Sequence, residues 1–150
     1  LHETFDFITM IYCDYGALST DDRKKLLRII YQHLKPGGKL LLDVFSKETF
    51  DSFREGQTWE SCPSGGFWRE HSYIALSGHY KYQDLITLEQ TTIISDAEVA
   101  TYYIWNTCFT QNSLIEEVNK SGFNVSGIFE NVAGEKSHHN SPTIAILLEK

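Results

Sequence analysis

The order of apolar and polar residues predicts a strand, a helix and a second strand within residues 1–45. Residues 5–11 form a short apolar run of the length of a strand. Apolar residues then recur at the spacing of a helix that is buried on one side; this stripe consists of Leu26, Leu27, Ile30 and Leu34. Residues 40–42 are all leucine, and consecutive apolar residues favour a parallel strand that is covered on both faces.

The residues that flank the apolar stripe predict where the helix begins and ends. Ser19 or Thr20 can cap its first turn, and two aspartates follow where the helix dipole favours negative charge. Pro36 and Gly37 suit the central positions of a type II turn, so we expect the helix to end at Leu34. The basic residues of the helix are expected mostly on its solvent-facing side; they are Arg23, Lys24, Lys25 and Arg28.

The middle of the chain loses the helical period. Three runs rich in β-branched and aromatic residues, at 70–82, 85–94 and 99–109, are separated by polar turns and predict an antiparallel meander. Ser77 and Gly78 are expected to form a bulge or bend in the first run. The glycines of residues 62–66 indicate a loop and not a phosphate cradle, because no helix follows them.

The helical period returns after Phe109. Thr110 is a suitable N-cap, and Gly122 is a suitable stop signal beyond the stripe; the stripe consists of Leu114, Ile115 and Val118. Residues 123–129 and 143–148 then predict two strands that pair as an antiparallel hairpin at a sheet edge.

Composition narrows the classes of function. A formal charge of −7 argues against a nonspecific nucleic-acid partner, since binding to phosphates needs a basic surface. No apolar run has the roughly 20 residues that cross a bilayer, and the first residues do not resemble a signal peptide, so we expect a cytoplasmic protein without a membrane partner. Cys13, Cys62 and Cys108 are too widely spaced for a disulfide framework, and the histidines form no zinc pattern, so no metal is expected.

Several of these segments together resemble the C-terminal half of a class I S-adenosylmethionine-dependent methyltransferase. They are residues 5–8, residues 34–43, and Phe109-Thr110 with the helix and the Gly122-Phe123 pair that follow. The resemblance implies an α/β fold with a partial Rossmann-like sheet. In that fold the strand order is 3-2-1-4-5-7-6, with strand seven antiparallel. Residues 5–11, 40–45, 123–129 and 143–148 would then be strands four, five, six and seven.

The resemblance also implies a division of the chain. Residues 1–55 and 109–150 would be the C-terminal half of the methyltransferase sheet, within a single domain fragment. Residues 56–108 would be an antiparallel β-meander insertion, which in such enzymes can form a lid or wall over the methyl acceptor.

The resemblance implies S-adenosyl-L-methionine as the cofactor of the full-length parent. The glycine-rich turn and the acidic ribose ligand of the family have no counterpart in these 150 residues, so we expect the isolated chain to be inactive. Tyr12, Cys13, Asp14 and Tyr15 follow strand four at the carboxyl edge of the sheet, where ligands of α/β folds bind, and are the expected cofactor-binding residues. The alternative is that Tyr12 and Tyr15 pack and that Asp14 caps a turn.

A small-molecule methyl acceptor is the expected substrate. The residues predicted to line its site are Asp43, Trp68, His71, Tyr103 and Trp105. Tyr73 and Tyr102 could join an aromatic pocket, or all these aromatic residues could form the core of the meander. Methyl transfer needs alignment of donor and acceptor, and it needs a base only if the nucleophile carries a proton. Candidate bases are Asp14, Asp43, Glu70, His71 and His79, and no catalytic residue is assigned.

Two other classes of function remain open from the sequence. One is a small-ligand binding or dimerisation module that is built on the antiparallel sheet and has no catalytic activity. The other is a complete enzyme of a different chemistry, which lacks support because no nucleophile and base stand at an informative spacing. Residues 5–11 would also be an unpaired edge strand in the isolated chain, which predicts a homodimer through this edge or coverage of it by the insertion.

Overall fold

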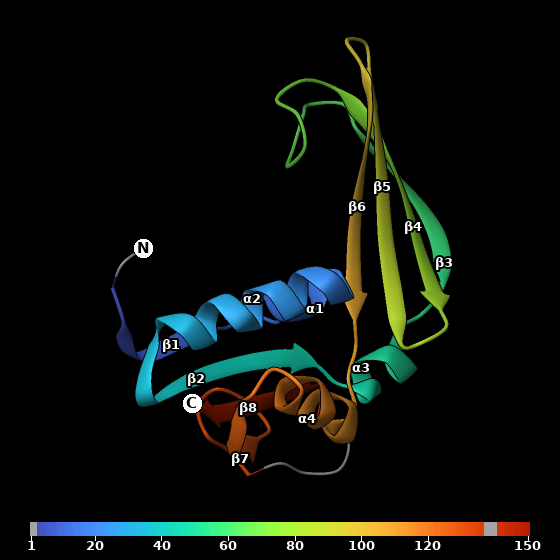
Figure 1. Ribbon diagram of the computed structural model, residues 1–150. Coiled ribbons are helices and arrows are strands. Elements are labelled where there is room, and N and C mark those ends of the chain that lie inside the picture. The colour runs from blue at the N-terminus through green and yellow to red at the C-terminus, as the bar shows by residue number, and fades with distance from the viewer. Residues whose placement is uncertain (1–2, 137–140) are drawn as a thin grey trace.

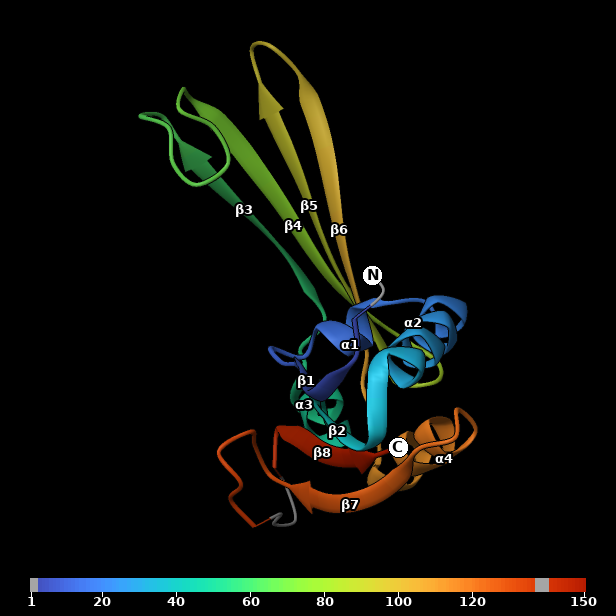
Figure 2. The same cartoon turned by 60° about the vertical axis from the view of Figure 1, so that its left-hand side comes forward.

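The computed structural model describes residues 3–136 and 141–150, which form two four-stranded sheets (Figure 1). The strands of the first sheet are, in spatial order, β1 (Phe5–Met10), β2 (Leu34–Phe45), β8 (Thr143–Glu149) and β7 (Asn124–Phe129). The second sheet contains, in chain order, β3 (Gly56–Cys62), β4 (Tyr73–Tyr82), β5 (Ile86–Ser95) and β6 (Val99–Thr107). Figure 2 shows the long strands of the second sheet extending away from the first.

The topology of the first sheet confirms the predicted methyltransferase arrangement. β1 and β2 are parallel, β8 is antiparallel to β2, and β7 is antiparallel to β8. The spatial order therefore corresponds to strands 4-5-7-6 of the predicted sheet, in which β8 is strand seven and runs antiparallel to its neighbours.

Helices α2 (Thr20–His33) and α4 (Gln111–Asn119) cover one face of the first sheet. Their apolar stripes pack against alternate residues of β2 and β8; the buried core includes Leu27, Ile30, Leu40, Leu42, Val44, Leu114, Val118, Ile144, Ile146 and Leu148. The predicted caps are confirmed. Ser19 Oγ accepts the N–H of Asp22 at the start of α2, and Thr110 and Ser113 form a reciprocal capping box at α4.

The other face of the first sheet is only partly covered within the described residues. Burial alternates along β2, and Leu41 is half-buried while both of its leucine neighbours are fully buried. On β1, Phe7 is 51% exposed. The prediction that both faces of residues 40–42 are covered is therefore wrong, because α2 and α4 lie on the same side.

The corner between α2 and β2 contains the predicted positive-φ glycine. Helix α2 ends at His33, and Gly37 has φ +74°. The strand already begins at Leu34, which pairs with Phe5, whereas Phe7 pairs with Lys39. The residues between these two pairs therefore bulge out of the ladder before the regular part of β2 begins.

The second sheet has one strand more than predicted. β3 was missed because Trp59 is its only large apolar residue and every residue before Cys62 is exposed, so the segment lacks an alternating pattern. The predicted bulge at Ser77-Gly78 is also wrong, since β4 and β5 pair without interruption. Gly78 has a packing role instead: a Cβ atom there would collide with the ring of Tyr80.

Candidate functional site

The loop that follows β1 lies at the carboxyl ends of the parallel strands and has an unusual backbone. Tyr12 and Cys13 both have left-handed conformations, with φ +80° and +61°. Such conformations are unfavourable for residues with side chains and persist only where neighbouring groups hold them. Here the Cys13 N–H donates to Oδ1 of Asp43, on β2, at 2.9 Å. Asp43 therefore fixes the loop.

Each side chain of this loop has a different environment. Tyr12 is 88% exposed, so it does not pack against the core. Cys13 is buried, and burial together with the nearby carboxylate of Asp43 raises the pKa of its thiol to about 12. The thiol is therefore protonated at neutral pH and is a poor nucleophile. Asp14 is exposed at the start of the short helix α1 (Asp14–Ala17).

Tyr15 points into the core, in agreement with the packing alternative. Its side chain is fully buried, and its hydroxyl donates to Oε1 of Glu117 at 2.6 Å. Burial and the Glu117 carboxylate raise the pKa of this phenol well above its usual value. Tyr15 therefore connects α1 to α4, while Tyr12 and Asp14 are exposed to solvent.

A buried ion pair beside Tyr15 had no signal in the sequence. Arg23 is 3% exposed, and its Nε lies 2.7 Å from Oε1 of Glu117. The guanidinium also donates to Oγ1 of Thr107 in β6 and lies over the ring of Phe109. The expectation that Arg23 faces solvent is therefore wrong. From α2, Arg23 contacts both α4 and the end of the second sheet. A helical wheel predicts only a solvated charge at this position.

The predicted acceptor residues do not form one group. The Trp68 ring stacks on Tyr102 with their centroids 4.8 Å apart, and the Trp68 N–H donates to the Tyr73 hydroxyl at 3.5 Å. Tyr103 and Trp105 alternate with Tyr102 along β6 and therefore lie on the opposite face of the sheet. His71 is exposed in the loop between β3 and β4, and Asp43 lies in the other sheet.

A shallow hollow lies on the face of the second sheet that Trp68 covers. It has a volume of about 460 Å³, and its lining includes Phe53, Glu55, His79 and Glu89. The His79 ring meets Phe53 edge-on, with centroids 5.8 Å apart, and Nε2 of His79 lies 3.9 Å from a Glu89 carboxylate oxygen. Phe53 follows helix α3 (Lys47–Ser52), which Ser46 caps directly after β2. The hollow therefore lies close to the carboxyl end of the first sheet.

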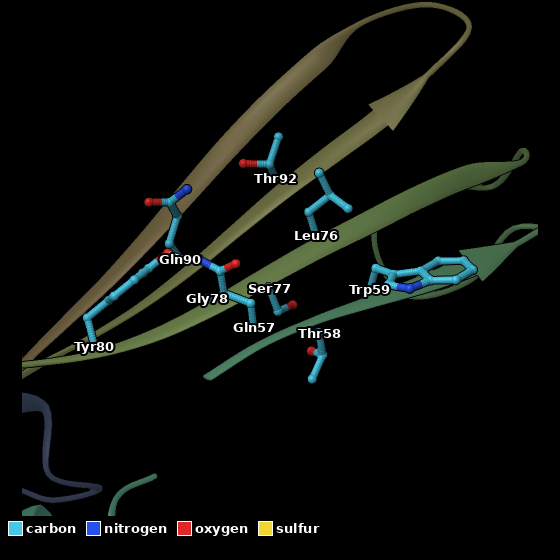
Figure 3. A pocket seen from close by; sticks show the side chains of 9 residues that line it. All are labelled: Gln57, Thr58, Trp59, Leu76, Ser77, Gly78, Tyr80, Gln90 and Thr92. Carbon is cyan, nitrogen blue, oxygen red and sulfur yellow. Dashed lines mark hydrogen bonds between the residues drawn. The ribbon is translucent and has the colours of Figure 1, made fainter. Parts of the chain in front are cut away.

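The opposite face of the second sheet carries another hollow, of about 470 Å³. Figure 3 shows that its lining comes from β3, β4 and β5 and includes Trp59, Leu76, Tyr80 and Gln90. It is shallow and open to solvent, and no charged residue lines it.

Two features are absent from the described part of the chain. No cluster of three or more His, Cys, Asp or Glu side chains there is arranged to hold a metal ion. No helix in residues 3–136 or 141–150 is long and apolar enough to span a membrane.

Comparison with known sequences points to methyltransferases. Residues 1–62 match the sequence profile of the ubiE/COQ5 methyltransferase family. Over 48 residues the chain is 44% identical to the ubiquinone/menaquinone biosynthesis C-methyltransferase UbiE of Cronobacter sakazakii, a match that covers 32% of this chain and 18% of that protein. The corresponding enzyme of Vibrio vulnificus is 45% identical over 47 residues, which are 31% of this chain and 17% of that protein.

Solved structures extend the similarity to the whole chain at the level of fold. A S-adenosylmethionine-dependent methyltransferase from Clostridium acetobutylicum has a TM-score of 0.72 at 13% identity, over 99% of this chain and 59% of that one. The methyltransferase CcbJ from Streptomyces caelestis has a TM-score of 0.68 at 11% identity, over 98% of this chain and 57% of that one. The amino pentose methyltransferase CalS10 from Micromonospora echinaspora, solved with bound SAM, has a TM-score of 0.54 at 17% identity, over 99% of this chain and 59% of that one. The chain thus spans less than two thirds of each of these relatives.

Proposed function

We propose that this chain, which has the fold of class I S-adenosylmethionine-dependent methyltransferases, forms the carboxyl-terminal part of an enzyme that methylates a small molecule. The observation that carries this function is the loop at residues 12–14, called the pinned loop because Asp43 accepts the N–H of Cys13. It lies at the carboxyl ends of β1 and β2, in a sheet of the order 4-5-7-6. Ligands of open α/β sheets bind at this edge.

The described residues fit one end of the cofactor. Tyr12 and Asp14 are exposed at the carboxyl edge of the sheet, and Asp43 holds the loop between them through the N–H of Cys13. We assign these residues to the methionine end of S-adenosyl-L-methionine, which supplies an electrophilic methyl group when it is bound. The glycine-rich turn and the acidic ribose ligand of the family have no counterpart in the 150 residues, so we propose that the rest of the cofactor binds to residues outside them.

A small-molecule acceptor is supported by the second sheet. The stacked pair Trp68 and Tyr102 and the hollow beside Phe53 and His79 lie on one face of this sheet, and this face presents both flat aromatic surfaces and polar groups. Solved structures of similar fold include a glycopeptide N-methyltransferase, MtfA, and a sugar N-methyltransferase, KedS8. We propose that an acceptor of comparable size binds on this face.

The chemical role of these residues is alignment. Methyl transfer is a direct displacement, so the protein accelerates it by holding donor and acceptor in line and by excluding water. Asp43 contributes by fixing the loop, and His79 with Glu89 is the described pair that offers a proton acceptor on the acceptor face. Asp43 and His71 remain predicted acceptor contacts, whereas Tyr103 and Trp105 face away from this hollow.

Titration of this chain with S-adenosylhomocysteine, followed by NMR, tests the cofactor assignment. We expect weak binding, with chemical-shift changes confined to the loop at residues 12–14. Shifts concentrated on the second sheet, or none at saturating ligand, would contradict the assignment. A parallel assay with labelled S-adenosylmethionine should show no methyl transfer by the isolated chain. Tight calorimetric binding or transfer would show that the 150 residues suffice.

Two further expectations concern the surroundings of the protein. β1 pairs only with β2 and leaves its other edge open within the described residues, so we propose that this edge pairs with a strand of a longer protein. We also propose a cytoplasmic location. All three cysteines are free thiols, which suits a reducing compartment.

A further inference from the structure

The two faces of the second sheet differ in charge. The face that carries Trp59, Leu76 and Tyr103, which we call the neutral face, has no charged residue at any described position of β3 to β6. The opposite face carries charged or titratable side chains, including Lys81 and Glu89. In a chain with a formal charge of −7, one face of a long sheet thus carries no charged side chain of its own, although the Arg23 guanidinium contacts Thr107 at the end of β6. Depletion of charge is typical of the centre of a protein–protein interface.

The neutral face also exposes large apolar side chains. Trp59 is 71% exposed, Tyr103 57% and Trp105 46%, and Leu76 and Val99 are exposed beside them. With about 150–250 Å² for each aromatic side chain, the exposed parts of Trp59, Tyr103 and Trp105 alone amount to roughly 260–440 Å². The largest apolar patch of a typical monomer is about 300–600 Å², and a stable interface buries about 800 Å² on each partner. The aromatic residues alone therefore have the area of a large surface patch, and the exposed aliphatic residues beside them extend it toward one half of an interface.

We propose that the neutral face packs against the same face of a second copy of this chain in a twofold dimer. Two copies that each carry a net negative charge repel one another unless the surfaces that meet are uncharged, and the neutral face meets this condition. A twofold arrangement places the same patch on both sides, so the aromatic residues supply both halves of the contact. Sheets that stack face to face lie about 10 Å apart, which leaves room for interdigitated side chains.

The shape of the face supports this partner over others. The hollow between Trp59, Leu76 and Tyr80 is shallow and open, as in a surface that receives side chains from a partner sheet (Figure 3). Nucleic acid needs basic residues, which this face lacks. The proposed dimer leaves the face with Trp68 and His79 free for the acceptor, and it does not depend on the proposed methyltransferase function.

Adjacent residues of β6 provide a matched pair of variants. Tyr103 is 57% exposed on the neutral face, and Ile104 is 52% exposed on the opposite face. Sedimentation velocity should show wild-type dimers at micromolar concentrations. Tyr103→Lys should raise the dissociation constant by at least about tenfold, because it buries an unpaired charge in the interface. Ile104→Lys should leave this constant unchanged. Trp59→Lys on β3 is an independent second variant in case Tyr103→Lys fails to fold, which circular dichroism reports.

Three outcomes would overturn this dimer. The wild type could remain monomeric at high concentration, or Tyr103→Lys and Ile104→Lys could weaken association equally. Alternatively, Phe7→Lys on the exposed edge of β1 could dissociate the dimer while Tyr103→Lys does not, which would place the contact at the first sheet. Neutral phosphatidylcholine vesicles serve as a further control, because binding of monomers to them through the neutral face would identify a lipid surface as the occupant instead.

Discussion

Asp43 is the residue on which the geometry of the candidate site depends. Its carboxylate accepts the N–H of Cys13 while Tyr12 and Cys13 both hold left-handed backbone conformations. The sequence placed Asp43 at the end of a strand but did not show that its partner would be a backbone group 30 residues away. A carboxylate that satisfies a neighbouring loop has no local pattern, so only the fold reveals it.

Replacement of this carboxylate should loosen the loop. Asp43→Ala removes a hydrogen bond to a charged group, so we expect the free energy of unfolding to fall by about 1.5–3 kcal/mol. The amide of Cys13 should also exchange faster with solvent. Urea denaturation and hydrogen exchange measure these two effects. Asp14→Ala, in the exposed adjacent position, should change stability by less than about 0.5 kcal/mol. Equal effects of the two substitutions would show that the Asp43 contact does not hold the loop.

Glu117 provides a second test at the level of single residues. Its carboxylate accepts hydrogen bonds from both Tyr15 and Arg23, so its removal leaves a buried guanidinium without its charge partner. We expect Glu117→Ala to lower the free energy of unfolding by about 3 kcal/mol or more. Glu116→Ala, on the exposed side of the same helix, is the matched control and should have little effect. Thermal or urea denaturation compares the two variants, and similar losses would argue against a structural ion pair.

Among the elements, those with a strong apolar period were predicted well from the sequence. The helix at residues 20–33 and the strand that follows combine a clear stripe, a cap and a Pro-Gly corner, all of which indicate the same structure. β3 has none of these signals, because it is an exposed edge strand that pairs with β4 alone. Sequence patterns report burial, so a strand that is held only by backbone hydrogen bonds escapes them.

The corner between α2 and β2 depends on the left-handed backbone conformation of one glycine, Gly37. Gly37 has φ +74° and open space around the position of a Cβ atom, so a side chain there costs only backbone strain. We expect Gly37→Ala to destabilise the chain by about 1 kcal/mol. Gly56 also has open space but no positive φ, so Gly56→Ala should be neutral or slightly stabilising. Denaturation midpoints should separate the two variants, and equal shifts would exclude strain as the cause.

At the scale of the whole molecule, buried thiol and phenol groups should make the free energy of unfolding depend on pH in the alkaline range. Burial raises the pKa of the Cys13 thiol to about 12 and that of the Cys108 thiol to about 11, from an ordinary value of 9.0. The pKa of Tyr15 is also raised. Above pH 9 the unfolded chain therefore loses protons that the folded chain retains, so the free energy of unfolding should fall as pH rises. Below pH 9 these groups should cause no change.

Urea denaturation under reducing conditions, at pH values from about 7.5 to 10.5, measures this dependence. Cys13→Ser keeps a side chain of similar shape but cannot ionise in this range, so its stability should fall less steeply than that of the wild type between pH 9 and 10.5. If both proteins lose stability at the same rate, the Cys13 thiol does not contribute.

The two connections between the sheets lie against each other. Ser46 forms a β-bridge with Phe109; the Phe109 N–H donates to the Phe45 carbonyl at 2.8 Å, and the Phe109 carbonyl accepts the Lys47 N–H at 2.8 Å. The chain therefore leaves the first sheet and returns to it at one point, and these backbone hydrogen bonds hold the strands on either side of the junction; Arg23 adds a contact to Thr107 at the end of β6. Residues 47–108 are in this sense an exchangeable module. A shorter or longer segment could replace them and alter the molecules that the protein accepts, while the pinned loop and the buried core of the first sheet stay the same.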